Sequence, residues 1–132
     1  MDEISKYLHT ELTRSIIRCY YTVYNTLRFG FLEKVYENAL RDKLVKTGFK
    51  EETQKQIKVY YDNEIVGEYY SDMVVDDKVI LDLKAAETIV AEHQVQHINY
   101  LRATEMEVSL LLNFGKEPQV VRRAFENKYK KS

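Results

Sequence analysis

Two aspartates and a lysine stand where carboxylates and a cation could act together. Asp82 lies inside the apolar run VILDLKA, Lys84 follows two residues later, and Asp72 precedes the run. Side chains two apart on a strand point to the same face, so Asp82 and Lys84 would project together, with Asp72 nearby if its strand is the neighbour. Burying a carboxylate in such a run costs several kcal/mol unless it is paired or binds a metal.

The chemistry that fits these residues is the binding of a hard divalent cation. Two convergent carboxylates suit Mg²⁺, which takes oxygen ligands and keeps several waters. Such an ion lowers the pKa of a bound water and stabilises charge on a phosphate, and a neighbouring lysine can orient the water or stabilise the transition state. The competing interpretation is a simple Asp82–Lys84 ion pair at the end of a strand, which leaves Asp72 unexplained.

Two helices are expected before these residues. Over residues 4–27 the apolar side chains recur at helical spacing, at Leu8, Leu12, Ile16, Cys19, Val23 and Leu27. Gly30 breaks this pattern, and a second helix over residues 31–46 is closed by Gly48. The buried face predicted for the second helix consists of Leu32, Val35, Tyr36, Ala39, Leu40 and Leu44.

The middle of the chain changes to the period of strands. Residues 56–61 and 65–70 alternate around an Asp62-Asn63 turn, which predicts a hairpin that continues through residues 73–75. After a second turn at Asp76-Asp77, residues 78–85 form a nearly continuous apolar strand, typical of a central strand covered on both faces.

One more helix and two more strands complete the expected order. A helix over residues 88–103 would pack through Ile89, Val90, Val95, Ile98 and Leu101. Residues 108–114 predict a buried strand, and residues 119–125 an edge strand after the break at Gly115 and Pro118. This order predicts an α/β sandwich with a mixed sheet.

The Asp72, Asp82 and Lys84 pattern resembles the signature of the PD-(D/E)XK phosphodiesterases. It reads Ser71-Asp72 and then, beyond a hairpin turn, Asp82-Leu83-Lys84. Ser71 stands where the signature has proline, and Asp82 stands where glutamate is commoner. Neither difference removes a required ligand.

Two further motifs support this resemblance and narrow it to one family. Gly30-Phe-Leu-Glu33-Lys-Val-Tyr36 matches the positions that give the GxxExxY family its name, and Gln96-His-Ile-Asn-Tyr100 is similar to a Q-x-x-x-Y helix motif of several nucleases in the same superfamily. With the stretch that ends in LLLNFG at residue 115, the resemblance covers about residues 11–125.

The resemblance implies a fold and a set of site residues. The fold is a PD-(D/E)XK nuclease-like core, a mixed β-sheet flanked by helices, with an extra N-terminal helix, in one domain over residues 1–132. The implied site residues are the metal ligands Asp72, Asp82 and Glu33, the catalytic lysine Lys84, and Gln96 and Tyr100 at its border. The competing interpretation of Glu33 is a first-turn acid favoured by the helix dipole.

The resemblance also implies a function. The expected activity is a Mg²⁺- or Mn²⁺-dependent hydrolysis of phosphodiester bonds in nucleic acid, with DNA favoured over RNA. The alternative is a non-catalytic module that retains the fold and binds nucleic acid or protein, since fold alone does not establish catalysis. A net charge of −1 counts against tight, independent binding to DNA. A homodimer would combine two clefts and two basic tails.

Three other patterns in the sequence have simpler interpretations. The basic residues of the segment 122–131 are expected to form a solvated tail. His93 and His97 lie four apart, but HQVQH lacks the glutamate of HExxH and a third ligand, which disfavours zinc. Tyrosines 20, 21 and 24 of the first helix favour packing or a dimer interface.

Composition sets the expected environment. No apolar run approaches the roughly 20 residues that span a bilayer, so no membrane segment is expected. Cys19 is the sole cysteine and is expected to be a small core residue. Because it has no partner for an internal disulfide, a reducing, cytoplasmic location is expected.

Overall fold

The computed structural model describes residues 8–87, 89 and 91–130, and the side chains of residues 69, 96, 97, 100 and 129 also lie outside this description. The elements in chain order are α1 (Thr10–Leu27), α2 (Glu33–Thr47), β1 (Glu51–Tyr61), β2 (Glu64–Val75), β3 (Val79–Lys84), α3 (Ala91–Ala103), β4 (Val108–Asn113), β5 (Gln119–Ala124) and a 3₁₀ turn, η2 (Asn127–Tyr129). This order is the one predicted from the sequence.

The strands form one mixed sheet. Within the described residues it has five strands, in the order β1-β2-β3-β4-β5. The pairs β1–β2, β2–β3 and β4–β5 are antiparallel, whereas β3 and β4 are parallel and are joined through α3. β3 is the middle strand, and its first five residues are buried, as its continuous apolar run predicts.

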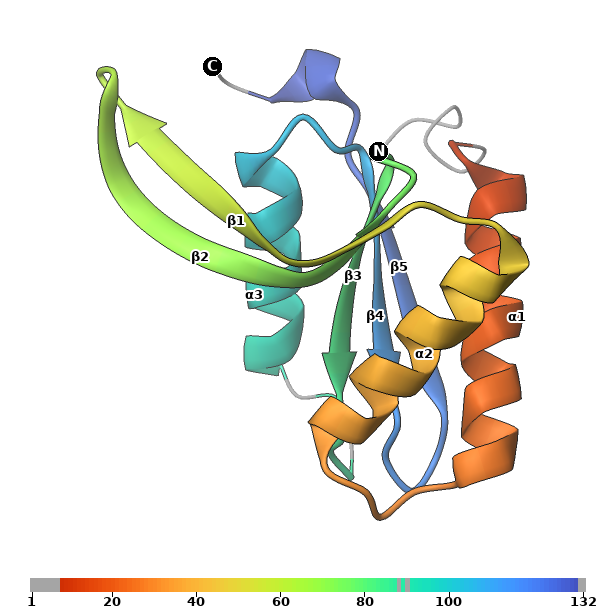
Figure 1. Cartoon of the computed structure of the whole chain (residues 1–132). Helices are drawn as coiled ribbons and strands as arrows, with labels where there is room; N and C mark the ends of the chain where they lie inside the picture. The colour runs from red at the N-terminus through yellow and green to blue at the C-terminus, as the bar shows by residue number, and fades with distance from the viewer. Residues whose placement is uncertain (1–7, 88, 90, 131–132) are drawn as a thin grey trace.

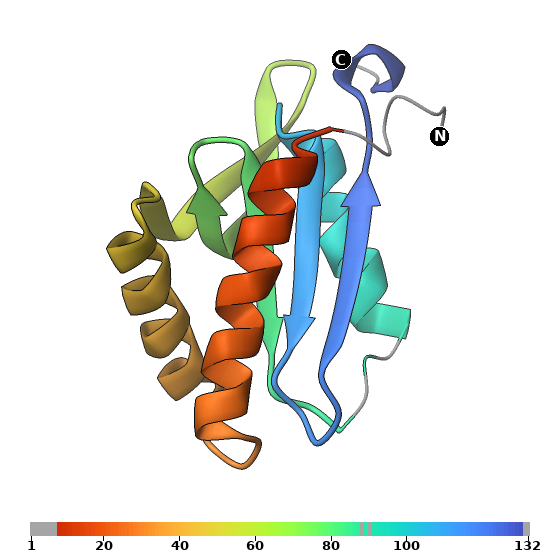
Figure 2. The ribbon, with the colours of Figure 1, turned by 90° about the vertical axis from the view of Figure 1, so that its right-hand side faces the viewer.

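Helices cover both faces of this sheet. α1 and α2 lie on one face and α3 on the other (Figures 1 and 2). Val79, Leu81 and Leu83 of β3 belong to the main core beneath α1 and α2. Ile80 belongs to a second cluster with Ile57, on the α3 side. Because side chains alternate along a strand, Asp82 and Lys84 share the face of Ile80 and project toward the α3 side.

The hairpin of β1 and β2 extends beyond the rest of the sheet as an arm. Only the segment Met73–Val75 of β2 pairs with β3, while β2 pairs with β1 along nearly its whole length. The arm curves past α3, and its tip lies away from the other strands (Figure 1). Asp62 and Asn63 at the tip have φ values of 49° and 65°, the left-handed conformation that a two-residue hairpin turn requires.

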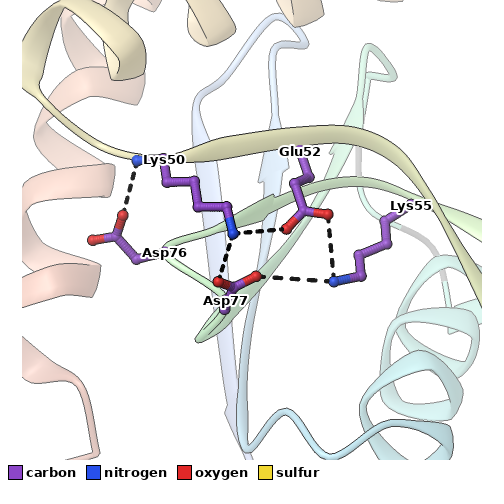
Figure 3. A network of polar contacts seen from close by, with 5 residues as sticks. All are labelled: Lys50, Glu52, Lys55, Asp76 and Asp77. Atoms are coloured by element: carbon purple, nitrogen blue, oxygen red, sulfur yellow. Dashed lines mark hydrogen bonds and ion pairs between the residues drawn. The ribbon is translucent and has the colours of Figure 1, made fainter.

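The root of the arm is fixed by a network of charged groups (Figure 3). The backbone N–H of Lys50 donates to Asp76 Oδ1 at 2.9 Å, and Lys50 Nζ lies 2.8 Å from Asp77 Oδ2. Lys55 Nζ lies 3.5 Å from Glu52 and 4.0 Å from Asp77. These contacts bind the turn between β2 and β3 to the start of β1.

Some apolar positions were predicted wrongly as core. Leu32 is 80% exposed because it precedes α2, and Val35 lies beside the buried stripe of Tyr36, Leu40 and Leu44. Val95 is 57% exposed, because α3 meets the second cluster through its C-terminal end at Ala103. Val90 lies outside the described residues, as does the start predicted for the first helix.

The basic segment near the C-terminus does not form a solvated tail as predicted. Arg122 donates to the Leu8 carbonyl at 2.6 Å, and Arg123 donates to Gln94 at 2.8 Å. Lys130 donates to the carbonyls of Thr104 and Met106. These cations hold β5 and the segment after it against the rest of the fold, and Lys131 lies outside the described residues.

Two predictions about the first helix are met. Cys19 is a buried core residue, 3% exposed. Tyr20 and Tyr24 are buried in the same core, which is the packing alternative for this group, and Tyr21 is partly exposed. Among the helices of the described chain, none combines the length and the apolar character needed to span a membrane.

Candidate active site

The site begins where β2 separates from β3. The last pair of the β2–β3 ladder joins Met73 to Leu81. Extending this register by one residue places Asp72 opposite Asp82, and opposed residues of an antiparallel pair point to the same face. The ladder does not continue; instead, the backbone N–H of Leu83 donates to Asp72 Oδ2 at 2.7 Å. The carboxylate of Asp72 thus takes the place of a backbone carbonyl as the acceptor for the Leu83 N–H.

Asp82 and Lys84 lie on β3 just beyond this separation. Asp82 is 5% exposed, and Lys84 is half-buried at the last residue of the strand. In the parallel ladder they lie opposite Leu111 and Asn113 of β4. A nearly buried carboxylate therefore lies on the same face as a lysine, with a second carboxylate on the neighbouring strand, as the sequence predicts.

Glu33 comes to the same region from α2, of which it is the first residue. Burial raises its pKa above the ordinary value, and the negative charges of Glu37 and Asp82 raise it further. The positive charges of Lys84 and His93 oppose this rise. Glu33 therefore lies within electrostatic reach of β3 and of α3, and its side chain is only partly covered by the protein.

The pKa of Asp72 is strongly perturbed. Burial raises its pKa to about 6. The Leu83 N–H and Lys84 lower the pKa, whereas the negative charges of Asp82 and Glu33 raise it. Lys84 thus attracts both Asp72 and Glu33, and a cation bound among the three carboxylates would relieve the repulsion that Asp82 and Glu33 exert on Asp72.

The donor set fits a hydrated Mg²⁺ ion better than a fully enclosed one. Among the described residues, no three His, Cys, Asp or Glu side chains are grouped so that they could hold one ion together. Asp72 and Asp82 come from neighbouring strands and interact electrostatically, and Glu33 of α2 also acts on Asp72. Mg²⁺ usually keeps several waters and binds through one or two carboxylates, so this pair matches its needs.

The remaining predicted residues lie on α3. Gln96 and Tyr100 both fall within this helix, but their side chains lie outside the described residues. His97 is outside in the same way. His93 is half-buried and acts electrostatically on Glu33.

Tyr36 of the GxxExxY motif holds the loop that precedes Glu33. Its ring is fully buried and stacks on Phe114, with the two ring centroids 4.5 Å apart. Its hydroxyl donates to the carbonyl of Arg28 and accepts from the backbone N–H of Phe31 at 3.1 Å. Gly30 between them has φ 116°, a conformation that favours glycine. The glycine and the tyrosine of the motif therefore shape one loop.

Asn113 fixes the chain that follows Lys84, a role that sequence reasoning missed. Its Oδ1 accepts from the Ala86 N–H at 3.1 Å, and its Nδ2 donates to the Ala86 carbonyl at 2.9 Å. The Lys84 carbonyl accepts from the Phe114 N–H at 2.7 Å. A polar residue at the end of the buried strand VSLLLN was the available signal.

Gly115 allows this close approach. A Cβ at this position would lie 1.7 Å from the Ala86 carbonyl oxygen, so no other residue fits without a backbone shift. Tyr24 of α1 donates its hydroxyl to the carbonyls of Gly115 and Lys116, at 2.9 and 2.7 Å. Buried tyrosines thus anchor both loops beside the carboxylates.

The comparisons with curated proteins and solved structures bear on the fold alone. No curated protein matches the chain. The crystal structure of SSO0001 aligns with a TM-score of 0.58 at 14% identity, over 71% of this chain and 50% of that one. The aligned part is thus about half the length of that protein, and at this identity the likeness concerns the fold.

A family model provides the assignment. The model described as the PD-(D/E)XK nuclease superfamily matches residues 10–124, from the start of α1 to the end of β5. The mixed sheet flanked by helices is the core predicted for that superfamily, with α1 as the N-terminal helix. The match includes Glu33, Asp72, Asp82 and Lys84. By fold and by family match, the chain belongs to the PD-(D/E)XK nuclease superfamily.

Proposed function

We propose that this chain is a nuclease of the GxxExxY type that hydrolyses phosphodiester bonds in nucleic acid with the aid of Mg²⁺ or Mn²⁺. DNA is the preferred substrate and RNA the lesser one. The observation that supports the proposal is that Asp72 accepts the backbone N–H of Leu83, the residue between Asp82 and Lys84, where β2 leaves β3. Nucleases of this superfamily generally use divalent metals, and membership implies contact with nucleic acid.

Each residue has a role in the proposed mechanism. Asp72 and Asp82 would hold the ion, and Glu33 would reach it through a water from the exposed side. When bound, the ion lowers the pKa of a coordinated water and neutralises charge on the phosphate. Lys84 orients the attacking water and stabilises the additional charge on the phosphate oxygens. Gln96 and Tyr100 of α3 would border the site.

The alternative function is a binding module that retains the fold without catalysis. Within the described residues no three side chains form a ready metal cluster, which favours this alternative. The net charge of −1 also gives little general attraction for phosphates. A module of this kind would bind nucleic acid or protein without hydrolysing it.

Hydrolysis assays with matched variants distinguish the two functions. Purified protein is incubated with Mg²⁺ or Mn²⁺ and with single-stranded, duplex and branched DNA and RNA. We expect wild type to cleave, and Asp82→Asn and Lys84→Met to lose at least about 100-fold in rate, as removal of one electrostatic group commonly does. Asp77→Asn is the control, because it removes an exposed carboxylate beyond the opposite end of β3.

The possible results lead to different conclusions. Cleavage that persists in Asp82→Asn belongs to a contaminant. Absence of cleavage on every substrate, together with no heat of Mg²⁺ or Mn²⁺ binding by calorimetry, supports the binding module. Cleavage by wild type and by Asp77→Asn that is absent from both site variants supports the nuclease.

Three further features belong to this proposal. Residues 1–132 act as a single nuclease-like domain in a reducing, cytoplasmic setting.

Two copies of the chain associate and present two clefts to one nucleic acid. Sedimentation equilibrium of the purified protein tests the association, and a mass equal to one chain at all concentrations would reject it.

A further inference from the structure

A pocket lies next to the proposed catalytic strand. Its volume is about 260 Å³, and it is lined by the three segments 29–31, 85–87 and 114–116. Two of these segments directly follow β3 and β4, which are parallel, so the pocket lies outside the carboxyl ends of two parallel strands. Crevices at this position are common ligand sites in α/β sheets.

Two phenylalanines give this pocket an aromatic character. Phe29 is 54% exposed and Phe31 is 48% exposed. Both belong to the loop between α1 and α2, and both line the same pocket. Aromatic rings that remain open to solvent beside a nucleic-acid site are suited to stacking on bases, and such stacking tolerates any base sequence.

The ring of Phe31 is held in place before any ligand arrives. Its backbone N–H donates to the Tyr36 hydroxyl at 3.1 Å, and the two rings meet edge to face with their centroids 6.0 Å apart. Tyr36 is itself buried and stacked on Phe114. A surface fixed in this way loses little conformational freedom when a ligand binds.

The opposite walls are equally constrained. The side-chain amide of Asn113 makes two hydrogen bonds to the backbone of Ala86. Gly115 lies so close to the Ala86 carbonyl that a Cβ would not fit. The pocket is therefore part of the fold and does not depend on a mobile surface loop.

The polar groups at the rim favour a base over a bare phosphate. Lys116 and Glu87 both line the pocket, so its rim carries one cation and one carboxylate. A carboxylate repels a phosphate but accepts hydrogen bonds from the exocyclic amino groups of bases. A lysine near the same rim can contact the phosphate that follows the base.

The pocket also adjoins the catalytic residues along the chain. Ala85 in its wall directly follows Lys84, and Phe31 precedes Glu33 by two residues. The wall of the pocket is therefore continuous along the chain with the residues that carry the proposed chemistry.

We propose that this pocket receives one unpaired nucleobase next to the scissile phosphate, with Phe31 as its stacking surface. The inference rests on the proposed nuclease function and specifies its substrate class. A base can enter only if it is free of its partner, so the substrate is single-stranded at that nucleotide, as in a single strand, a flap or a loop. An intact duplex is a poor substrate.

The test measures binding separately from hydrolysis. A fluorescein-labelled single-stranded oligodeoxynucleotide and a blunt hairpin duplex of the same composition are titrated with protein in EDTA, and anisotropy is recorded. We expect wild type to bind the single strand more tightly than the duplex. Phe31→Ala should weaken single-strand binding by roughly 5- to 100-fold, the range for loss of one base–aromatic stack, and leave duplex binding unchanged.

Matched variants make the test specific. Leu32→Ala removes an apolar side chain of the same loop that is 80% exposed and does not line the pocket, and it should bind as wild type. Phe31→Trp retains a stacking face and should restore binding. If Phe31→Ala fails to fold by circular dichroism, Phe31→Leu replaces it, because leucine keeps apolar volume without the aromatic face.

An abasic scan locates the base. An abasic nucleotide placed in turn along the single strand should weaken wild-type binding at one position next to the mapped cleavage site. The same oligonucleotide should cause no further loss in Phe31→Ala. Equal binding of wild type and Phe31→Ala to the single strand, or no sensitive position, would overturn the proposal.

Failure of the pocket and failure of the nuclease give different results. Single-strand binding that depends on Phe31, without cleavage in Mg²⁺ or Mn²⁺, would retain the base pocket and reject the nuclease. Cleavage of duplex as fast as single strand, unaffected by Phe31→Ala, would retain the nuclease and reject the pocket. If wild type binds no nucleic acid, both are rejected.

Discussion

The carboxylate of Asp72 accepts the backbone N–H of Leu83 at 2.7 Å, at the residue where β2 stops pairing with β3. One oxygen of Asp72 therefore stabilises the separated strand, and in the proposed mechanism the same carboxylate holds the ion. Asp72 therefore has both a structural role and a role in the proposed chemistry. A substitution can separate the two roles, because an amide keeps an acceptor oxygen and loses the charge.

The first prediction concerns Asp72. Asp72→Asn should retain stability close to that of wild type, whereas Asp72→Ala should lose about 1–3 kcal/mol because the Leu83 N–H is left without its acceptor. Both variants should lose most of their Mg²⁺ affinity. Urea denaturation and calorimetry measure the two effects. Equal stability of Asp72→Ala and wild type would show that the hydrogen bond does not hold the strand.

The second prediction concerns Tyr36. Tyr36→Phe keeps the ring that stacks on Phe114 but removes the hydroxyl that contacts Arg28 and Phe31. We expect a loss of about 1–3 kcal/mol in the free energy of unfolding, as for other buried hydrogen bonds left unmade. Tyr21→Phe, on the partly exposed side of α1, is the matched control and should change stability by less than about 0.5 kcal/mol. Thermal and urea denaturation compare the two.

The third prediction concerns Gly115. Gly115→Ala brings a Cβ against the Ala86 carbonyl, so we expect destabilisation at or above the upper part of the roughly 1–3 kcal/mol range for overpacking. Gly67→Ala is the control, because its Cβ would meet Val59 at an ordinary 3.7 Å. A melting temperature for Gly115→Ala equal to that of Gly67→Ala would contradict the tight approach of the two loops.

The fourth prediction concerns pH at the root of the arm. The hydrogen bond from Lys50 lowers the pKa of the Asp77 carboxyl below its ordinary value. Because the folded-state pKa is depressed, the stability from this contact is present above the ordinary pKa of aspartate and is lost as pH falls through the folded value. NMR titration of wild type should show the low pKa, and Lys50→Met should raise it. An unchanged pKa in Lys50→Met would exclude this contact in solution.

Much of the fold could be predicted from local patterns. The strand VILDL was expected to be central because its apolar run is continuous, and it is. The turns at Asp62-Asn63 and Asp76-Asp77 were expected because these residues tolerate positive φ, and all four adopt it. Asp82 and Lys84 were expected on one face because they are two apart on a strand, with Asp72 near them if its strand was the neighbour, and β2 does pair with β3.

Other features depend on tertiary contacts that no local pattern contains. The alternation of side chains in β2 predicts a strand. It does not predict that, among the described strands, β2 pairs with β3 only over Met73–Val75. The roles of Arg122 and Arg123 were missed because charge alone does not reveal the carbonyl or amide that a guanidinium meets. The role of Asn113 was missed because its partner, Ala86, belongs to a loop placed by the sheet.

The arm of β1 and β2 has a consequence for how the protein behaves at high concentration. Its backbone presents hydrogen-bonding groups along β1, an outer strand, and along most of β2. Exposed strands of this length can template polymerisation between chains. Lys58, Glu64 and Glu68 are exposed along the arm, and burying their charges against an incoming strand is costly. These charges let the chain extend a long hairpin while opposing aggregation.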